Sequence, residues 1–150
     1  MSSFCIAQNK NIMTKTFESE NGFYKLEYPE NFKISYKNNI LNIYSYDNSS
    51  ALTVSSYFFE NGIDDSRFSK MFETFTKDYV HSDDKVELNK NIWIQRFIKQ
   101  SENEKVIWTM CLKRNDKVSL VISINFGENE RDIIIDQYQQ IFQTIVNLGA

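Results

Sequence analysis

The side chains best suited to metal binding or acid–base chemistry lie close together after a predicted helix. His81 is the only histidine, and with Asp83 and Asp84 it forms a His-x-Asp-Asp cluster. Metal sites usually need three or four ligands held rigidly, whereas these residues follow one another in a polar connection. We therefore interpret them as a solvated helix end and expect no metal ligand among them.

The two cysteines, Cys5 and Cys111, are too few and too far apart for a disulfide framework or a CxxC metal or redox motif. Cys111 could act as a nucleophile if a base approached it, and His81 is the one ordinary imidazole base. A cysteine between Met110 and Leu112 in a predicted strand is more typical of a small buried residue.

Acidic pairs occur only in predicted turns or at helix ends, where solvent would surround them. They are Asp64 with Asp65, Asp83 with Asp84, and Glu102 with Glu104. The sequence has no Gly-x-Ser-x-Gly elbow, and its four glycines are scattered rather than grouped in a phosphate-binding loop. We predict a protein that is not an enzyme, with no catalytic residue and no cofactor.

The charge balance argues against nucleic acid as a partner. The formal net charge is -3, whereas neutralising a phosphate backbone requires a basic face. Lys113, Arg114 and Lys117 cluster around one turn, but Asp116 lies among them, so we expect a solvated hairpin tip rather than a phosphate site. No apolar run is long enough to span a membrane.

Residues 1–13 are expected to be a flexible tail or the remnant of a signal peptide. Cys5-Ile6-Ala7 resembles the small-residue end of a secretory signal, but a basic n-region and an apolar h-region are missing. As written, the sequence predicts a cytoplasmic protein. If the true start lies upstream of Met1, the mature chain would begin near Gln8 and be periplasmic or secreted.

Residues 14–150 read as one domain that begins with short strands. Tyr24, Leu26 and Tyr28 alternate with polar residues, and after Pro29 the alternation resumes in a second inward row. That row contains Phe32, Ile34 and Tyr36. The pair Asn38-Asn39 predicts a tight turn with positive φ, followed by a strand over 40–46. Another strand is predicted over 51–59.

The hydrophobic period then changes to that of a helix over 64–81, and later over a C-terminal segment that ends near Gly149. Between the two helices, strands are predicted at 85–89, 92–99, 105–114 and 118–126, the last two joined by a hairpin turn at Asn115-Asp116. The apolar stripes are Phe68, Met71, Phe72, Phe75 and Tyr79 in the first helix, and Ile134, Tyr138, Ile141, Phe142, Ile145 and Leu148 in the second. This order predicts an α+β domain in which two main helices flank a meandering antiparallel sheet.

The segment from Gly22 to Ile34 carries a family resemblance. An aromatic-rich strand ends in Tyr28-Pro29, and Phe32 follows after two residues. With the order of elements from about Phe17 to Leu148, this pattern resembles the Mog1/PsbP superfamily and its bacterial relatives, which often have tryptophan at the position of Phe32. The resemblance implies an α/β/α sandwich and a docking or assembly role rather than catalysis, and it transfers no functional residue.

Several aromatic residues lie on strand faces that also carry polar residues. Either a helix on each sheet face buries them, which we favour, or they form an exposed patch suited to a protein interface or a shallow ligand groove. The candidates are Tyr44, Tyr46, Tyr57, Trp93 and Phe97.

We predict a non-enzymatic binding or accessory protein, of a chaperone, adaptor or immunity type. It would dock a protein partner through a sheet face or edge, as a monomer or dimer. The alternative is a small-molecule or lipid carrier with a pocket between helix and sheet.

Overall fold

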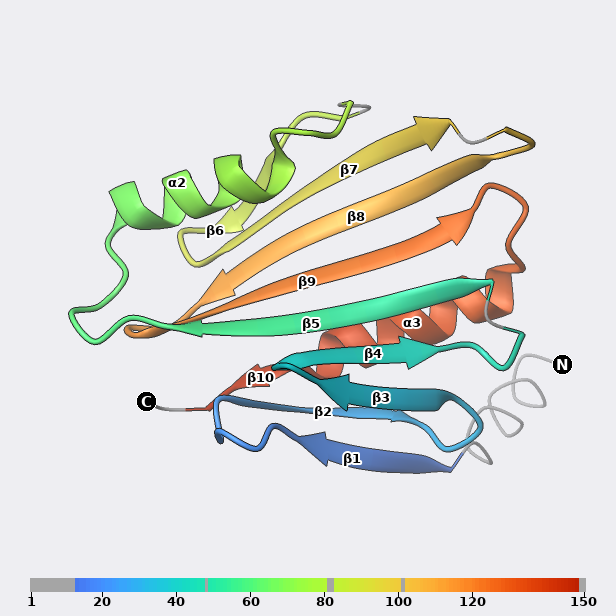
Figure 1. Ribbon diagram of the computed structural model, residues 1–150, viewed down its shortest axis with the longest axis horizontal. Coiled ribbons are helices and arrows are strands. Elements are labelled where there is room, and N and C mark those ends of the chain that lie inside the picture. Colours follow the sequence, from blue (N-terminus) through green and yellow to red (C-terminus); the bar gives the residue numbers. More distant parts are fainter. Residues whose placement is uncertain (1–12, 48, 81–82, 101, 149–150) are drawn as a thin grey trace, which may run out of the picture.

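A computed structural model describes residues 13–47, 49–80, 83–100 and 102–148. The predicted tail, apart from Met13, lies outside the described residues, as do His81 and Gly149. Among the described residues, the long sheet contains seven antiparallel strands in the order β3-β4-β5-β9-β8-β7-β6 (Figure 1). Their bounds are β3 (Lys33–Lys37), β4 (Ile40–Tyr44), β5 (Ser50–Phe58), β6 (Val86–Asn89), β7 (Ile92–Gln100), β8 (Lys105–Arg114) and β9 (Val118–Gly127).

The long sheet consists of two meanders joined in its middle. Strands β3 to β5 follow one another, β6 to β9 follow one another, and β5 pairs with β9 along its whole length. The predicted turn between β3 and β4 is confirmed, because Asn38 and Asn39 have φ values of 53° and 66°. The strands predicted at 85–126 are confirmed as β6 to β9.

The two predicted helices lie on opposite faces of this sheet. Helix α2 (Asp65–Thr76) is capped by Asp64, whose carboxylate accepts a hydrogen bond of 2.8 Å from the Arg67 N–H, and it ends at Thr76, before the predicted limit of 81. Its buried Phe68 and Phe72 belong to one core, and Tyr138 of α3 (Asp132–Thr144) belongs to the other. The predicted α/β/α arrangement is therefore confirmed.

A smaller sheet lies in the same layer as α3. It contains β1 (Thr14–Glu18), β2 (Tyr24–Pro29) and β10 (Val146–Asn147), in the order β1-β2-β10. The alternating residues predicted to face the core from β2 are buried and belong to the same core as α3: Tyr24, Leu26 and Tyr28.

The predicted end of the second helix is wrong. The helix stops at Thr144, because Ile145 has an extended backbone and the next two residues pair with β2 instead. Ile145 is nevertheless buried, so its place in the apolar stripe does not require the helix to continue. Ile34 was expected to face inward, but it is exposed because β3 is the edge strand of the long sheet.

Each helix is narrower than the sheet that it covers. Seven strands about 4.8 Å apart span roughly 29 Å, whereas a helix with its side chains is about 10 Å wide. Helix α2 packs against β7, β8 and β9, while α3 and the smaller sheet together cover β4, β5 and β9 and reach Cys111 on β8. The long sheet therefore keeps one open region on each face, at opposite ends of the strand order.

Candidate functional site

The open region on the α3 side is aliphatic, and we call it the isoleucine face. Its two most exposed apolar residues are Val86 and Ile98, while Ile94 and Ile107 are half-buried. Strand register forms two apolar pairs, Ile98 with Ile107 and Ile94 with Val86, and the pair of Arg96 and Thr109 lies between them. The full face is Val86 on β6, Ile94, Arg96 and Ile98 on β7, and Ile107 and Thr109 on β8.

A pocket lies between α3 and the isoleucine face. It has a volume of about 200 Å³, and Ile94, Arg96 and Thr109 form the side that it shares with this face. The rest of the lining is mostly apolar: Cys111, Ile122, Ile124 and Phe126 from the sheet, and Ile135, Tyr138, Gln139 and Phe142 from α3. A pocket between helix and sheet is therefore present, beside an exposed apolar surface.

Three cations lie at the α3-facing positions of β7 and β8. They are Arg96, Lys105 and Lys113, and neither strand has an acidic residue at such a position. Asp83, which precedes β6, places a carboxylate oxygen 2.7 Å from the Arg96 Nε, and the Lys113 Nζ donates to the Ile145 carbonyl at 2.7 Å. Arg96 lines the pocket, and Lys105 and Lys113 lie outside its lining on the same face of β8.

The open region on the α2 side is polar at its centre, and we call it the tyrosine face. Tyr44 is half-buried, and Tyr57 is exposed with its ring 5.5 Å from that of Phe75 on α2. The small residues Ala51, Thr53 and Ser55 lie between them. The full face is Ile40, Asn42 and Tyr44 on β4, and Ala51, Thr53, Ser55 and Tyr57 on β5.

The five aromatic candidates do not form one surface. Trp93 and Phe97 are buried under α2, where the Trp93 ring lies 4.8 Å from that of Phe68. The favoured interpretation of burial holds for these two, and only Tyr44, Tyr46 and Tyr57 remain as surface candidates. Tyr46 follows β4, and its hydroxyl accepts a hydrogen bond of 2.8 Å from Arg131.

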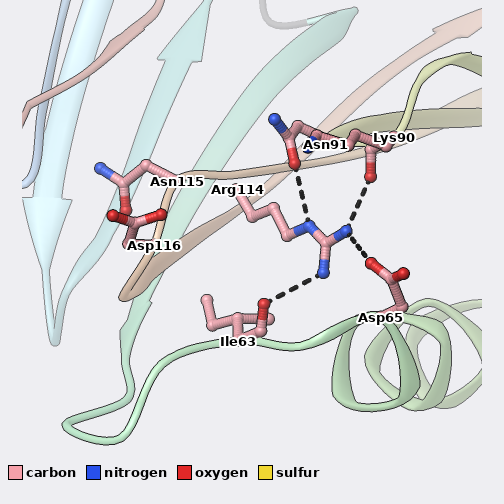
Figure 2. A pocket seen from close by; sticks show the side chains of 7 residues that line it. All are labelled: Ile63, Asp65, Lys90, Asn91, Arg114, Asn115 and Asp116. Carbon is pink, nitrogen blue, oxygen red and sulfur yellow. Dashed lines mark hydrogen bonds and ion pairs between the residues drawn. The ribbon is translucent and has the colours of Figure 1, made fainter.

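A larger, polar pocket of about 600 Å³ lies at the end of the sheet beside α2. Figure 2 shows the Arg114 guanidinium at its centre, with hydrogen bonds to Asn91 Oδ1, the Ile63 carbonyl, the Lys90 carbonyl and an Asp65 carboxylate oxygen. These distances run from 2.6 to 3.2 Å. Four of the five guanidinium N–H groups are engaged, so the arginine ties together three chain segments and has little capacity left for an anion.

The expected solvated tip around Lys113, Arg114 and Lys117 is therefore wrong for Arg114, whose side chain is 5% exposed. The sequence carried a signal for this burial. Arg114 continues the apolar row of β8 formed by Trp108, Met110 and Leu112, and alternation places it on the face that α2 covers. A guanidinium there must be hydrogen-bonded, as Arg114 is.

Cys111 has the properties of a structural residue, as its sequence context predicts. It is buried, and burial raises the pKa of its thiol to about 12. Because the thiolate is the nucleophilic form, a thiol with this pKa is unreactive at neutral pH.

Among the described residues, no three His, Cys, Asp or Glu side chains come together as a possible metal site. Asp83 instead pairs with Arg96, and Asp84 is exposed. Within the described ranges, no helix is long and apolar enough to cross a membrane.

Sequence reasoning missed the isoleucine face, although β7 carried a signal for it. Ile92, Ile94 and Ile98 alternate with Trp93 and Phe97, so this strand is largely apolar on both faces. Such a strand is normally covered on both sides, but which side lacks its cover depends on where the helices pack.

Comparison with known proteins supports the fold. No family model and no curated protein matches the sequence. A Bacteroides thetaiotaomicron crystal structure superposes with a TM-score of 0.68 and 9% identity, over 90% of this chain and 48% of that one. This chain thus spans about half the length of that protein.

Two further structures match this chain over nearly their whole length. The Saccharomyces cerevisiae Ran-binding protein Mog1p has a TM-score of 0.60 with 10% identity, over 91% of this chain and 96% of Mog1p. A Synechocystis PsbP (CyanoP) has a TM-score of 0.57 with 7% identity, over 91% and 94%. The chain has the Mog1/PsbP-like fold, and at these identities the likeness shows the fold alone.

Proposed function

We propose that this protein is a non-enzymatic accessory protein that binds another protein through its isoleucine face. The observation that carries this proposal is the presence of two exposed or half-buried aliphatic pairs, Val86 with Ile94 and Ile98 with Ile107, beside a pocket. Contiguous exposed apolar patches are uncommon on soluble proteins and often mark interaction sites.

Two of the groups that could take part in chemistry, Cys111 and Arg114, support a non-enzymatic role, because both are buried and Arg114 is held by structural contacts. The Cys111 thiol is buried with a raised pKa, and the Arg114 guanidinium is held by four hydrogen-bond acceptors. The fold is compatible with protein binding, since Mog1p is a Ran-binding protein.

Docking through a sheet face is better supported than docking through a sheet edge. The edge strand β6 has a register shift between Glu87 and Asn89, and the other edge strand, β3, begins and ends with lysine. Both irregular pairing and edge lysines hinder the addition of another strand.

A small-molecule or lipid carrier is the second candidate, because the pocket lies between a helix and the sheet as that alternative requires. Its volume of about 200 Å³ is smaller than the roughly 300–1,000 Å³ typical of ligand pockets. The aliphatic surface also continues beyond the pocket along β7 and β8. Both features favour protein binding over a carrier role.

Affinity capture from an extract of the source cells tests the proposal, using the purified protein as bait. Ile98→Glu introduces a charge on the isoleucine face, and Ile40→Glu is its matched control on the tyrosine face, since the two residues are 38% and 41% exposed. We expect recovery of the bound protein to fall by about tenfold with Ile98→Glu and to be unchanged with Ile40→Glu. Equal recovery with both variants, or no saturable partner, would contradict the proposal.

A further inference from the structure

We infer that the docking element of the partner is an acidic amphipathic helix that lies beside α3 and inserts one large apolar side chain into the pocket. This inference rests on the proposed function and specifies the chemistry of its partner. Three features of the isoleucine face lead to it: its main-chain pairing, the size of the pocket, and its charges.

The main chain of the isoleucine face is already paired. Strand β8 pairs with β7 and β9, and β7 pairs with β6 and β8, so a partner on this face meets side chains only. A helix is the element that covers a sheet face in this architecture, as α2 does on the opposite side of the same strands. A partner helix on the isoleucine face would complete the layer that α3 leaves unfinished.

The pocket has the size of one side chain. A volume of about 200 Å³ corresponds to roughly seven groups the size of a water molecule, which is the number of carbon atoms in a phenylalanine side chain and leaves room for the smaller leucine or methionine. Ile94, Ile135 and Phe142 provide apolar walls, and Gln139 adds a polar group. Interfaces commonly place an anchor of this kind in such a pocket and surround it with weaker contacts.

The charges around the pocket favour an acidic partner. Arg96 and Lys105 lie on the sheet side, and Lys113 is engaged at the C-terminal end of α3. Asp83 offsets part of the Arg96 charge, and α3 has its own exposed acids, Asp132 and Asp136, in its first half. Acidic residues on the partner are therefore expected along the flank that faces β7 and β8.

Synthetic helical peptides and methyl NMR of the full chain test this inference. The reference peptide has an apolar stripe with one phenylalanine and glutamates on one flank; a second replaces the glutamates with lysines, and a third replaces phenylalanine with alanine. We expect the reference peptide to shift the methyl signals of Ile94, Ile98, Ile107 and Ile135. Each altered peptide should bind about tenfold more weakly.

A charge exchange provides the internal control. In Lys105→Glu, the preference for the glutamate peptide over the lysine peptide should shrink or reverse, whereas Lys33→Glu on β3 should leave it unchanged. Equal affinities for the three peptides, or methyl shifts confined to the tyrosine face, would overturn the inference. Octanoate that shifts the same pocket methyls at lower concentration than the reference peptide would overturn it in favour of an acyl ligand.

Failure of the inference is distinguishable from failure of the proposed function. A partner whose capture depends on Ile98 but not on the charge of Lys105 would overturn the acidic helix and leave protein binding through the isoleucine face intact. Capture that is indifferent to Ile98→Glu would contradict the proposed function itself.

Discussion

The two open regions of the long sheet are similar in origin and different in composition. Helix α2 covers only part of one face, and α3 with the smaller sheet covers only part of the other. The centre of the tyrosine face carries Thr53 and Ser55, whose hydroxyls can remain hydrated, whereas the isoleucine face carries Ile98 and Ile107, which gain free energy when removed from water. An open sheet face is thus a candidate interface when it carries exposed aliphatic pairs.

A single cross-strand row shows how the position of a helix decides burial. Register places Tyr44, Ala51, Asn125, Trp108 and Phe97 in one line across β4, β5, β9, β8 and β7. Phe97 at one end lies under α2 and is fully buried, while Tyr44 at the other end is half-buried. Aromatic residues on one face of one sheet therefore differ in role.

Replacing the aromatic residue at each end of this row, Phe97 or Tyr44, with alanine should give the largest difference in stability between two variants. We expect Phe97→Ala to lower the free energy of unfolding by about 4 kcal/mol, because it leaves a cavity under α2. Tyr44→Ala should cost about 1 kcal/mol, since its side chain is only partly covered. Urea denaturation measures both, and similar losses would contradict the assignment of covered and open ends.

Arg114 tests whether the polar pocket beside α2 is structural. We expect Arg114→Ala to cost about 3 kcal/mol, because the carbonyls of Ile63 and Lys90 lose their buried donor. Asp65 is largely exposed and adds little. The control is Arg131→Ala, an exposed arginine paired with Asp47, for which a much smaller loss is expected. Equal losses of unfolding free energy for the two variants in urea denaturation would contradict a structural role for Arg114.

The charged variants of the two open faces should have small effects on folding. We expect both Ile98→Glu and Ile40→Glu to change the free energy of unfolding by less than about 1 kcal/mol, since neither creates a buried cavity or a buried charge. Thermal unfolding followed by circular dichroism measures this. A larger loss for Ile98→Glu alone would mean that Ile98 is part of the core, and the comparison of the two faces would need revision.

The reactivity of Cys111 tests whether reagents can reach the sheet side of the pocket between α3 and the isoleucine face. In a Cys5→Ser background, we expect slow reaction with thiol reagents at pH 8 and fast reaction in denaturant, because burial raises the Cys111 pKa to about 12. Fast labelling of the folded protein would contradict the burial of Cys111 in the pocket lining.

The same shift predicts a small dependence of stability on pH. Above pH 9 the unfolded state loses the thiol proton while the folded state keeps it, so stability should fall as the pH rises from about 9 towards 12. Urea denaturation of Cys5→Ser against Cys5→Ser/Cys111→Ala isolates this contribution. Parallel curves for the two proteins over this pH range would contradict it.

The sequence predicted those features of the fold that depend on local period and turn chemistry. Strands β6 to β9 followed from alternation, the turn at Asn38 and Asn39 from the tolerance of asparagine for positive φ, and the start of α2 near Asp64 from the change in hydrophobic period. The pairing of the C-terminal residues with β2 was not predictable, because it depends on a strand more than a hundred positions away.

The candidate site was harder to predict than the fold. Alternation in β7 indicated two apolar faces, but only the packed positions of α2 and α3 show that the Trp93 side is covered and the Ile98 side is open. The sequence pattern made several aromatic residues candidates for the surface, but two of them, Trp93 and Phe97, belong to the core. The burial of Arg114 could be predicted from its position in the apolar row of β8.

Site-specific photo-crosslinking in the source cells tests the central claim most directly. A photoreactive phenylalanine analogue placed at position 98 samples the isoleucine face, and the same group at position 40 samples the tyrosine face at matched exposure. We predict a discrete protein adduct from position 98 and none from position 40. Adducts from position 40 alone, or from neither position, would contradict the account.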